Sequence, residues 1–245
     1  MAMYREENPE CLRELISEYL GCPCRYFPPA ADGKEVVAAY EEAKARGERE
    51  GFTPILVALD GILWECLLLN ACPSGQGEEF LPEERDAYRK QALAAPVPEG
   101  NPFELSGEPA GFTEPEDGQE MSISDGLWDY AAGTTLPLLL AEIPVKNPWE
   151  IFAFLPFGGW NECPDTPMLM AAAKYWYKKH GAVPAVITHD VLEFSLPRPV
   201  SREEAPALAM EQYAFCPDTM EQGNIDPSSM AGILSQSCCW YFWWD

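Results

Sequence analysis

The residues best equipped for catalysis are a cysteine and a histidine in the C-terminal half of the chain. Cys163 could serve as a nucleophile, and His189, oriented by Asp190 or Glu193, is the base that the sequence supplies for it. Asp165 follows two residues after Cys163, however, and a nearby carboxylate raises the pKa of a thiol. Buried cysteines are also more often inert small hydrophobes. We therefore expect a packed thiol and keep a small thiol-dependent hydrolase or transferase as the alternative.

A metal site is a second chemical possibility for the same residues. Cys163, Cys216 and His189 would offer zinc two thiolates and an imidazole. They lie far apart in the sequence and lack the closely spaced ligand pair of most structural zinc sites. The segment Cys22-Pro-Cys24 is tightly spaced, but it has no histidine nearby and is expected to hold packed thiols. We predict no bound metal and no cofactor.

A glycine-rich loop at residues 158–165 and three other polar segments are the candidates for binding. Trp160 follows two glycines, so its amphipathic ring is expected either to anchor a partner or to close over the core. The other segments are the turn 188–190, the loop 216–226 and the chain end 243–245. If the four segments converge on one face, the expected binding residues are Trp160, Asn161, Glu162, Asp165, Asp218 and Trp244. Asp165 also has a purely structural interpretation, because it can cap a helix that begins at Thr166.

The elements that must position these loops follow from turn and capping signals. Asn8-Pro9 starts a helix, and Ser201 with Glu204 forms a capping box. Asp60-Gly61 is the strongest two-residue hairpin signal in the chain and predicts a strand on either side of it. The expected helices cover residues 9–20, 32–47, 82–94, 166–180, 201–215 and 227–235. The expected strands cover residues 25–28, 53–59, 62–70, 136–143, 149–155, 183–188, 191–196 and 238–244.

Two stretches of the chain share a spacing pattern. Residues 51–60 read Gly-x-x-Pro, an apolar run and Asp, and residues 181–190 repeat that order at the same spacing. With a helix expected before each glycine, the pattern predicts a βαββα unit present twice, an internal duplication. Two unrelated helix–hairpin units with common turn chemistry would give the same pattern. Antiparallel hairpins with helices packed on the sheet make the predicted fold class α+β.

The two expected units are separated by an acidic segment. Residues 96–126 are rich in proline and glycine, hold eight Asp and Glu residues and contain no Lys or Arg. This composition is typical of a solvated linker or a long loop. We therefore divide the chain into an N-terminal α+β unit at residues 1–95, this linker at 96–126 and a C-terminal α+β domain at 127–245.

The overall charge limits the kinds of partner. The 245 residues include 16 Lys and Arg against 40 Asp and Glu, a formal net charge of −24. Such a surface repels nucleic-acid phosphates and anionic lipids, so we expect neither nucleic acid nor membrane as a partner. Residues 1–8 are polar and unlike a signal peptide, and the odd number of scattered cysteines is unlike a disulfide scaffold. We expect a cytoplasmic protein with reduced thiols.

Several motifs of the C-terminal half resemble a known family. They are Trp149-Glu-Ile-Phe-Ala-Phe-Leu-Pro-Phe-Gly-Gly-Trp-Asn-Glu-Cys-Pro-Asp165, Ala173-Lys-Tyr-Trp176, Pro184-Ala-Val-Ile-Thr-His-Asp190, Glu211-Gln-Tyr-Ala-Phe-Cys-Pro-Asp218 and Trp240-Tyr-Phe-Trp-Trp-Asp245. Together they resemble the bacterial domain of unknown function 4253 over about residues 137–245. Upstream, Gly51-Phe-Thr-Pro-Ile-Leu-Val57 and Leu63-Trp-Glu-Cys66 look like the N-terminal extension of relatives from gut Firmicutes. The resemblance implies kinship and brings no established activity with it.

The sequence as a whole favours a non-catalytic binding module, because it holds no complete catalytic set and is strongly acidic. The partner that it predicts is a basic protein, as for an immunity-like protein that captures a basic toxin, since opposite charges speed association. Two alternatives stay open. One is the thiol-dependent enzyme built on Cys163 and His189, and the other is a small-ligand sensor with a pocket between the two repeats.

Overall fold

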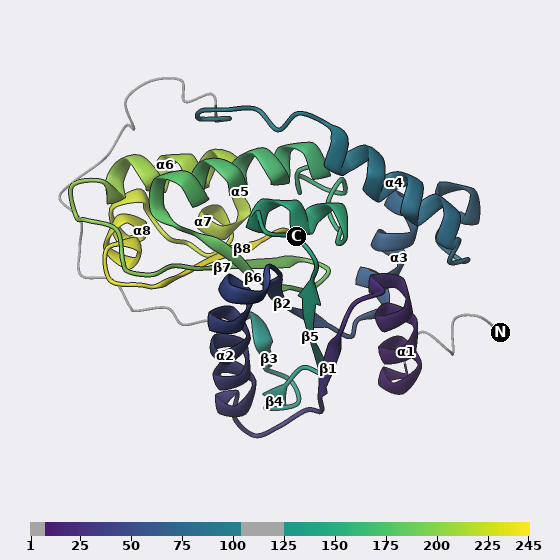
Figure 1. Cartoon of the computed structure of the whole chain (residues 1–245). Coiled ribbons are helices and arrows are strands. Elements are labelled where there is room, and N and C mark those ends of the chain that lie inside the picture. The colour runs from purple at the N-terminus through teal and green to yellow at the C-terminus, as the bar shows by residue number, and fades with distance from the viewer. Residues whose placement is uncertain (1–7, 104–124) are drawn as a thin grey trace.

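The centre of the fold is one mixed sheet, which the computed structural model places between two layers of helices (Figure 1). The structure describes residues 8–103 and 125–245. In spatial order the strands are β1 (Cys24–Phe27), β5 (Leu138–Ile143), β2 (Thr53–Ala58), β6 (Val183–Ile187), β7 (Val191–Ser195) and β8 (Cys239–Trp243). β2 and β6 pair in parallel, and the other neighbours pair antiparallel. The predicted mixture of helices with a sheet is confirmed, and the sheet joins strands from both parts of the chain.

Helices cover both faces of the sheet. α2 (Lys34–Glu50) packs on one face, and Figure 1 shows it across the sheet from α5 and α6. The opposite face carries α1 (Pro9–Leu20), α3 (Gly61–Ala71), α4 (Pro82–Ala94), α5 (Thr166–His180), α6 (Ala205–Phe215), α7 (Asp218–Glu221) and α8 (Pro227–Leu234). Shorter elements are the 3-10 turns η1 (Pro73–Gly75), η2 (Asp125–Leu127) and η3 (Pro148–Ala153), and a two-stranded sheet of β3 (Trp128–Asp129) and β4 (Thr134–Thr135).

β2 shows why the core has two parts. Side chains alternate across a strand, so Ile55 and Val57 join the larger core under α1, α3 and α5, while Leu56 and Ala58 join the smaller core under α2. Every residue of β2 is buried, because helices cover both faces of the sheet at this strand. This explains why the segment reads as an unbroken apolar run and not as an alternating one.

The larger core contains an aromatic cluster around Trp176 of α5. Its ring stacks on Phe242 of β8, with centroids 5.4 Å apart, and meets Phe194 and Trp240 edge-on. Phe103 also stacks on Trp176, at 5.1 Å. Phe103 belongs to the predicted linker, so the first residues of that segment pack against α5. Residues 104–124 of the predicted linker lie outside the described residues.

Local signals located most of the other elements correctly. α1, α4 and α5 have the predicted bounds, and β6 and β7 form the predicted hairpin. The side chain of Asn8 accepts a hydrogen bond from the Glu10 amide at 3.0 Å and so caps α1. α1, α2 and α5 each end at a glycine in the left-handed region, a backbone conformation that other residues seldom adopt.

The hairpin predicted at Asp60-Gly61 is wrong. Asp60 is instead the N-cap of α3, where its carboxylate accepts hydrogen bonds from the amides of Ile62 and Leu63. The buried residues of this segment follow a helical spacing and are Leu63, Trp64, Leu67, Leu68 and Ala71. Aspartate is favoured both in hairpin turns and at helix N-caps, and burial of this apolar face decided between them.

Two further expectations differ from the structure. The strand predicted at residues 149–155 is the 3-10 turn η3, which begins with Asn147-Pro148, the same helix-start signal as Asn8-Pro9. The internal duplication is not shown, because a helix follows β2 where a strand follows β6. What the two halves do share is a helix that ends at a left-handed glycine and leads into a strand with proline at its second position.

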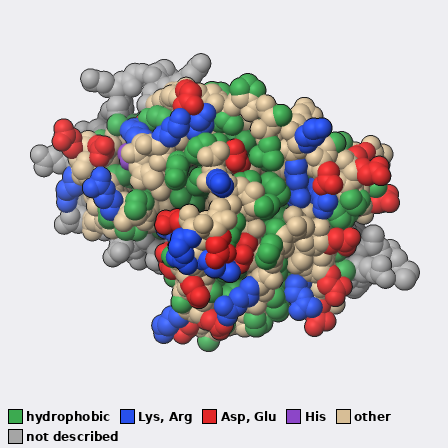
Figure 2. All heavy atoms as spheres, viewed as in Figure 1, with side chains coloured by type: hydrophobic (Ala, Val, Ile, Leu, Met, Phe, Trp, Pro, Cys, Tyr) green, Lys and Arg blue, Asp and Glu red, His purple; other side chains and the backbone are tan. Residues whose placement is uncertain are grey.

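Two properties of the surface bear on possible partners. Within residues 8–103 and 125–245, no helix has the length and apolar character needed to cross a membrane. Figure 2 shows basic and acidic side chains interspersed over the face seen in Figure 1. This face of the molecule therefore carries charges of both signs.

Candidate functional site

The parallel strands β2 and β6 bring two polar segments together at their carboxyl ends. Asp60 follows β2, and the turn Thr188-His189-Asp190 follows β6. His189 Nδ1 bonds Asp60 Oδ2, although the two residues are 129 positions apart in the sequence. His189 Nε2 lies 3.6 Å from Asp190 Oδ2. The imidazole is thus held between two carboxylates.

This arrangement favours the charged forms of both partners. The hydrogen bond to Asp60 raises the pKa of His189 above its ordinary value, and the Asp190 charge adds to the effect. Burial opposes ionisation of Asp60, but the bond to His189 and the amides of α3 lower the pKa of this carboxyl overall. Both ring nitrogens lie near carboxylates, which favours the protonated imidazolium, and an imidazolium cannot take a proton from a thiol.

Asp190 connects the turn to the end of the chain. Its side chain accepts hydrogen bonds from Thr188 Oγ1 at 2.7 Å and from Trp243 Nε1 at 3.0 Å. Its backbone carbonyl accepts the amide of Trp244 at 3.0 Å. Asp190 therefore holds the chain end against the β6–β7 turn.

The second Cys-Pro-Asp motif lies against the same chain end. Cys216 Sγ donates to the carbonyl of Trp243 at 3.0 Å, and Thr219 Oγ1 accepts the Trp243 amide at 3.0 Å. Asp218 accepts the amide of Asp245 at 3.1 Å. The structure thus brings together three of the segments that the sequence singled out, at 188–190, 216–226 and 243–245.

The glycine-rich loop 158–165 is fastened to α3 and to α5. Asn70 of α3 donates to the carbonyls of Pro156 and Gly158, at 2.7 and 2.9 Å. Trp160 is half-buried against the core and donates from Nε1 to the Phe157 carbonyl at 2.9 Å. Asp165 caps α5 by accepting the amide of Met168, as its structural interpretation predicts. Of the candidate residues in this loop, Asn161, Glu162 and Asp165 are exposed.

The two cysteines of the site are packed thiols with raised pKa values. Cys163 is 4% exposed, and burial raises its pKa, with Cys216 and Cys66 adding to the effect. Burial also raises the pKa of Cys216. In the described parts of the chain no hydrogen bond joins Cys163 to His189, and no group of three or more His, Cys, Asp or Glu side chains is placed to hold a metal ion.

Two site residues differ from what the sequence indicated. The sequence makes Trp244 a binding candidate, but it is completely buried, packing on Phe157 and Phe215. The sequence favours a hairpin turn at Asp60 and does not single it out as a site residue. The signal that could have found it was the shared Gly-x-x-Pro spacing, which places Asp60 and Asp190 at equivalent points after their strands.

Replacing Asp60 by asparagine is expected to reveal the ion pair through the pH dependence of stability. Asparagine can still cap α3, so the change removes mainly the charge on His189's partner. Because folding raises the pKa of His189, the ion pair contributes its full stabilisation below the unfolded pKa of about 6.5. This contribution is lost as pH rises through the folded pKa. The lowered pKa of Asp60 gives stability that is lost as pH falls through its folded value. Urea unfolding near pH 6 should show a loss of about 1 to 2 kcal/mol, and a smaller one near pH 9.

A matched control is Asp226→Asn at the N-cap of α8. Asp226 caps through the amides of Ser228 and Ser229, and its lowered pKa comes from Ser229 and these amides, with no histidine involved. The loss of unfolding free energy in the Asp226→Asn variant should not decline between about pH 6 and pH 9. A loss in the Asp60 variant that stays constant over this range would contradict the ion pair.

Comparison with known proteins gives a match for the C-terminal part of the chain. Residues 139–245 match a family model described as Domain of unknown function (DUF4253), which confirms the resemblance. No curated protein and no solved structure matches the chain. The matched part supplies loop 158–165, the His189 turn and the chain end, whereas Asp60 and Asn70 come from residues before it.

Proposed function

Since residues 139–245 match a family described only as a domain of unknown function, we propose a function from the site itself. The protein is a non-catalytic binding module that docks a basic segment of a partner protein on the loops beyond β2 and β6. The observation that carries this proposal is the convergence of these loops around Asp60, His189 and Asp190.

The charge of the converging loops supports a basic partner. Apart from His189, every charged side chain in segments 156–165, 188–190, 216–222 and 243–245 is acidic. Glu162, Glu221 and Asp245 are exposed, and Asp190 and Asp218 are half-buried. Half-buried carboxylates held in place by hydrogen bonds bind a guanidinium or ammonium group with less loss of side-chain freedom than mobile surface acids.

Aromatic side chains at the same end provide area for contact. Trp160 and Trp243 are both half-buried, so part of each indole is accessible. Both indole N–H groups already donate hydrogen bonds within the protein, which holds the rings in place. Fixed, partly exposed tryptophans beside carboxylates suit arginine and lysine side chains, which stack on aromatic faces.

The thiol-dependent alternative has less support than binding. A nucleophilic cysteine needs a lowered pKa or a neighbouring base. Burial instead raises the pKa of Cys163, and both nitrogens of His189 face carboxylates. An immunity-like role, in which the acidic loops cover a basic toxin, fits the same charge argument.

The test is retention of partners from the native host on immobilised protein at low and high salt. Opposite charges should make retention of a basic protein strong at low salt and weak at high salt. Replacing Trp160 by alanine, or Glu162 by lysine, should weaken the affinity for the retained protein on the order of tenfold.

The matched control is Glu41→Lys, which makes the same change in net charge at an exposed position of α2, across the sheet. This variant should retain the partner as the wild type does. The proposal fails if nothing basic is retained at low salt, if salt has no effect, or if Glu41→Lys weakens binding as much as Glu162→Lys.

A further inference from the structure

The segment Cys22-Pro23-Cys24 joins the end of α1 to the edge strand β1, and its two thiols lie close together. Successive side chains of an extended segment alternate between its faces, so residues 22 and 24 share a face. Both cysteines are accordingly half-buried against the larger core, whereas Pro23 is exposed. Cys24 Sγ donates to the Cys22 carbonyl at 3.4 Å, which holds its side chain back toward residue 22. A hydrogen bond also joins the two thiols.

The spacing of this pair allows a disulfide bond. Residues two apart on a strand have Cα atoms about 6.6 Å apart, and disulfides join Cα atoms up to about 6.8 Å apart. Cys22 lies in a bend of the chain before β1, which brings the two residues closer than a straight strand would. A disulfide here closes a small ring over one intervening residue. Strained and partly exposed disulfides are readily reduced, so the pair can pass between its two redox states.

The two thiols differ in acidity. The hydrogen bond from Cys22 lowers the pKa of Cys24 below its ordinary value, and Ser17 adds to the effect. The same hydrogen bond, together with burial, raises the pKa of Cys22. Because a thiolate and not a thiol attacks a disulfide, Cys24 is the attacking residue of the pair. Cys22 keeps its proton until the second step.

A buried guanidinium favours negative charge at this pair. Arg89 is 8% exposed and donates to the carbonyls of Tyr19 and Leu20 at the end of α1, at 2.7 and 3.2 Å. Within residues 8–103 and 125–245 it forms no ion pair, and its Nε has no hydrogen-bond partner. Its charge favours ionisation of Cys22. A buried cation without an ion-pair partner is costly, and a thiolate formed at Cys22 reduces that cost.

We propose that Cys22 and Cys24 are a redox-active dithiol that reduces small-molecule disulfides. The Cys24 thiolate attacks one sulfur of a disulfide R–S–S–R, which forms a mixed disulfide and releases one RS⁻. Cys22 then loses its proton to solvent and attacks Cys24 Sγ, which closes the Cys22–Cys24 disulfide and releases the second RS⁻. Each RS⁻ takes up a proton, so one disulfide becomes two thiols while the protein loses two electrons and two protons.

This site is independent of the docking surface proposed above. Cys24 and Ile55 both lie opposite Ala141 of β5, so the dithiol is level with the first residues of β2. Asp60 follows the last residue of β2, at the other end of the sheet. Either proposal can therefore fail without the other.

The test is treatment of the full chain with oxidised glutathione, followed by alkylation of free thiols and tryptic digestion. Cleavage after Arg13 and Arg25 gives a peptide of residues 14–25 whose only cysteines are Cys22 and Cys24. In most molecules this peptide should become lighter by two hydrogens and carry no alkyl group, and two molecules of reduced glutathione should appear for each disulfide formed. Cys11, also half-buried, lies in the neighbouring peptide of residues 6–13 and should react about tenfold more slowly.

Variants distinguish the two roles. Cys22→Ser keeps the attacking thiol and removes the resolving one, so the reaction should stop at a mixed disulfide between glutathione and Cys24. Cys24→Ser leaves only the thiol with the raised pKa and should react about tenfold more slowly. Serine is close to cysteine in size and both positions are half-buried, so far-ultraviolet circular dichroism should show unchanged folding.

The matched control is Cys11→Ser, which should leave the oxidation of peptide 14–25 unchanged. The proposal is overturned if that peptide stays fully alkylated in the wild type or ends as a mixed disulfide with glutathione. It is also overturned if Cys22→Ser and Cys24→Ser react at the same rate to the same product.

Discussion

Replacing Trp176 by alanine is expected to lower the free energy of unfolding by about 4 kcal/mol. Trp176 is fully buried and has ring contacts with Phe103, Phe194, Trp240 and Phe242. Its removal leaves a large cavity between α5 and the sheet, and the rings around it lose both burial and stacking. A loss of this size is a substantial part of the stability of an ordinary domain. Urea unfolding followed by far-ultraviolet circular dichroism measures it without relying on tryptophan fluorescence.

The neighbouring residue on the same helix provides the control. Tyr177 is 39% exposed, so Tyr177→Ala also removes an aromatic ring from α5 but creates little cavity. Its cost should be below about 1 kcal/mol. If the two variants unfold at similar urea concentrations, the aromatic cluster is not the main source of stability in the larger core.

The second large effect is expected at Glu211, a buried carboxylate of α6. It accepts hydrogen bonds from Tyr175 Oη at 2.8 Å, Trp176 Nε1 at 3.2 Å and Lys179 Nζ at 2.9 Å. Replacing Glu211 by alanine should cost about 3 kcal/mol, because the buried indole N–H loses its acceptor and α5 loses its polar link to α6. The measurement is again urea unfolding at neutral pH.

Two companion variants separate the charge from the contacts. Glu211→Gln keeps the shape and one acceptor oxygen, so it should cost about half as much as alanine. Glu203 lies exposed just before α6, and Glu203→Ala should change stability by less than about 0.5 kcal/mol. Equal losses in the glutamine and alanine variants would mean that the charge, and not the set of contacts, carries the effect.

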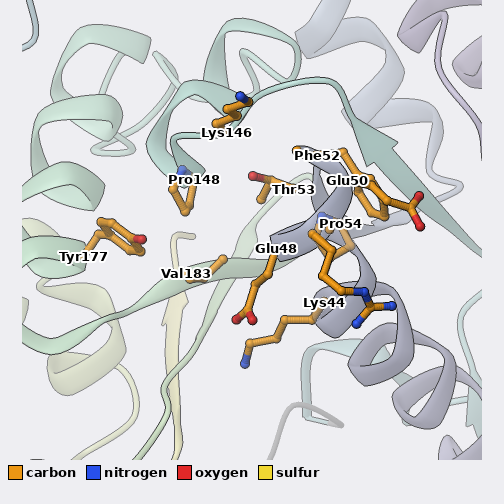
Figure 3. Close-up of a pocket in the computed structure, with 13 residues that line it drawn as sticks. Lys44, Glu48, Glu50, Phe52, Thr53, Pro54, Lys146, Pro148, Tyr177 and Val183 are labelled. Carbon is orange, nitrogen blue, oxygen red and sulfur yellow. The ribbon is translucent and has the colours of Figure 1, made fainter.

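The two ends of the parallel pair β2–β6 differ in charge, and the proposed docking of a basic segment depends on this difference. Loops with acidic side chains surround Asp60 and Asp190 at the carboxyl ends. The other ends border the groove shown in Figure 3, which is lined by charged side chains of both signs, Lys44, Arg49 and Lys146 together with Glu48 and Glu50. The net charge of the whole chain, −24, does not describe the local charge at either end. We therefore expect basic protein segments to bind at the carboxyl ends of these strands.

Local sequence signals determined much of the secondary structure. Asn8 before Pro9 and Asp165 before Thr166 start α1 and α5 through side-chain caps, and glycines in the left-handed region end them. These signals act within a few residues, so they can be recognised without knowing the fold. The motifs that resemble the family lie in residues 139–245 and were equally visible in the sequence.

Tertiary structure decided how the candidate site is assembled and added Asp60 to it. Asp60 follows an apolar run and precedes glycine, which suits a hairpin turn as well as a helix cap, and only the packing of α3 on the sheet selects the cap. Asp60 then reaches His189, 129 positions later in the sequence, because β2 and β6 pair in parallel. Cys163 and His189 are not joined, because η3 and its loop bury the thiol in the core. Contacts between segments that are distant in the sequence determine which strands pair, and local sequence patterns do not predict this pairing.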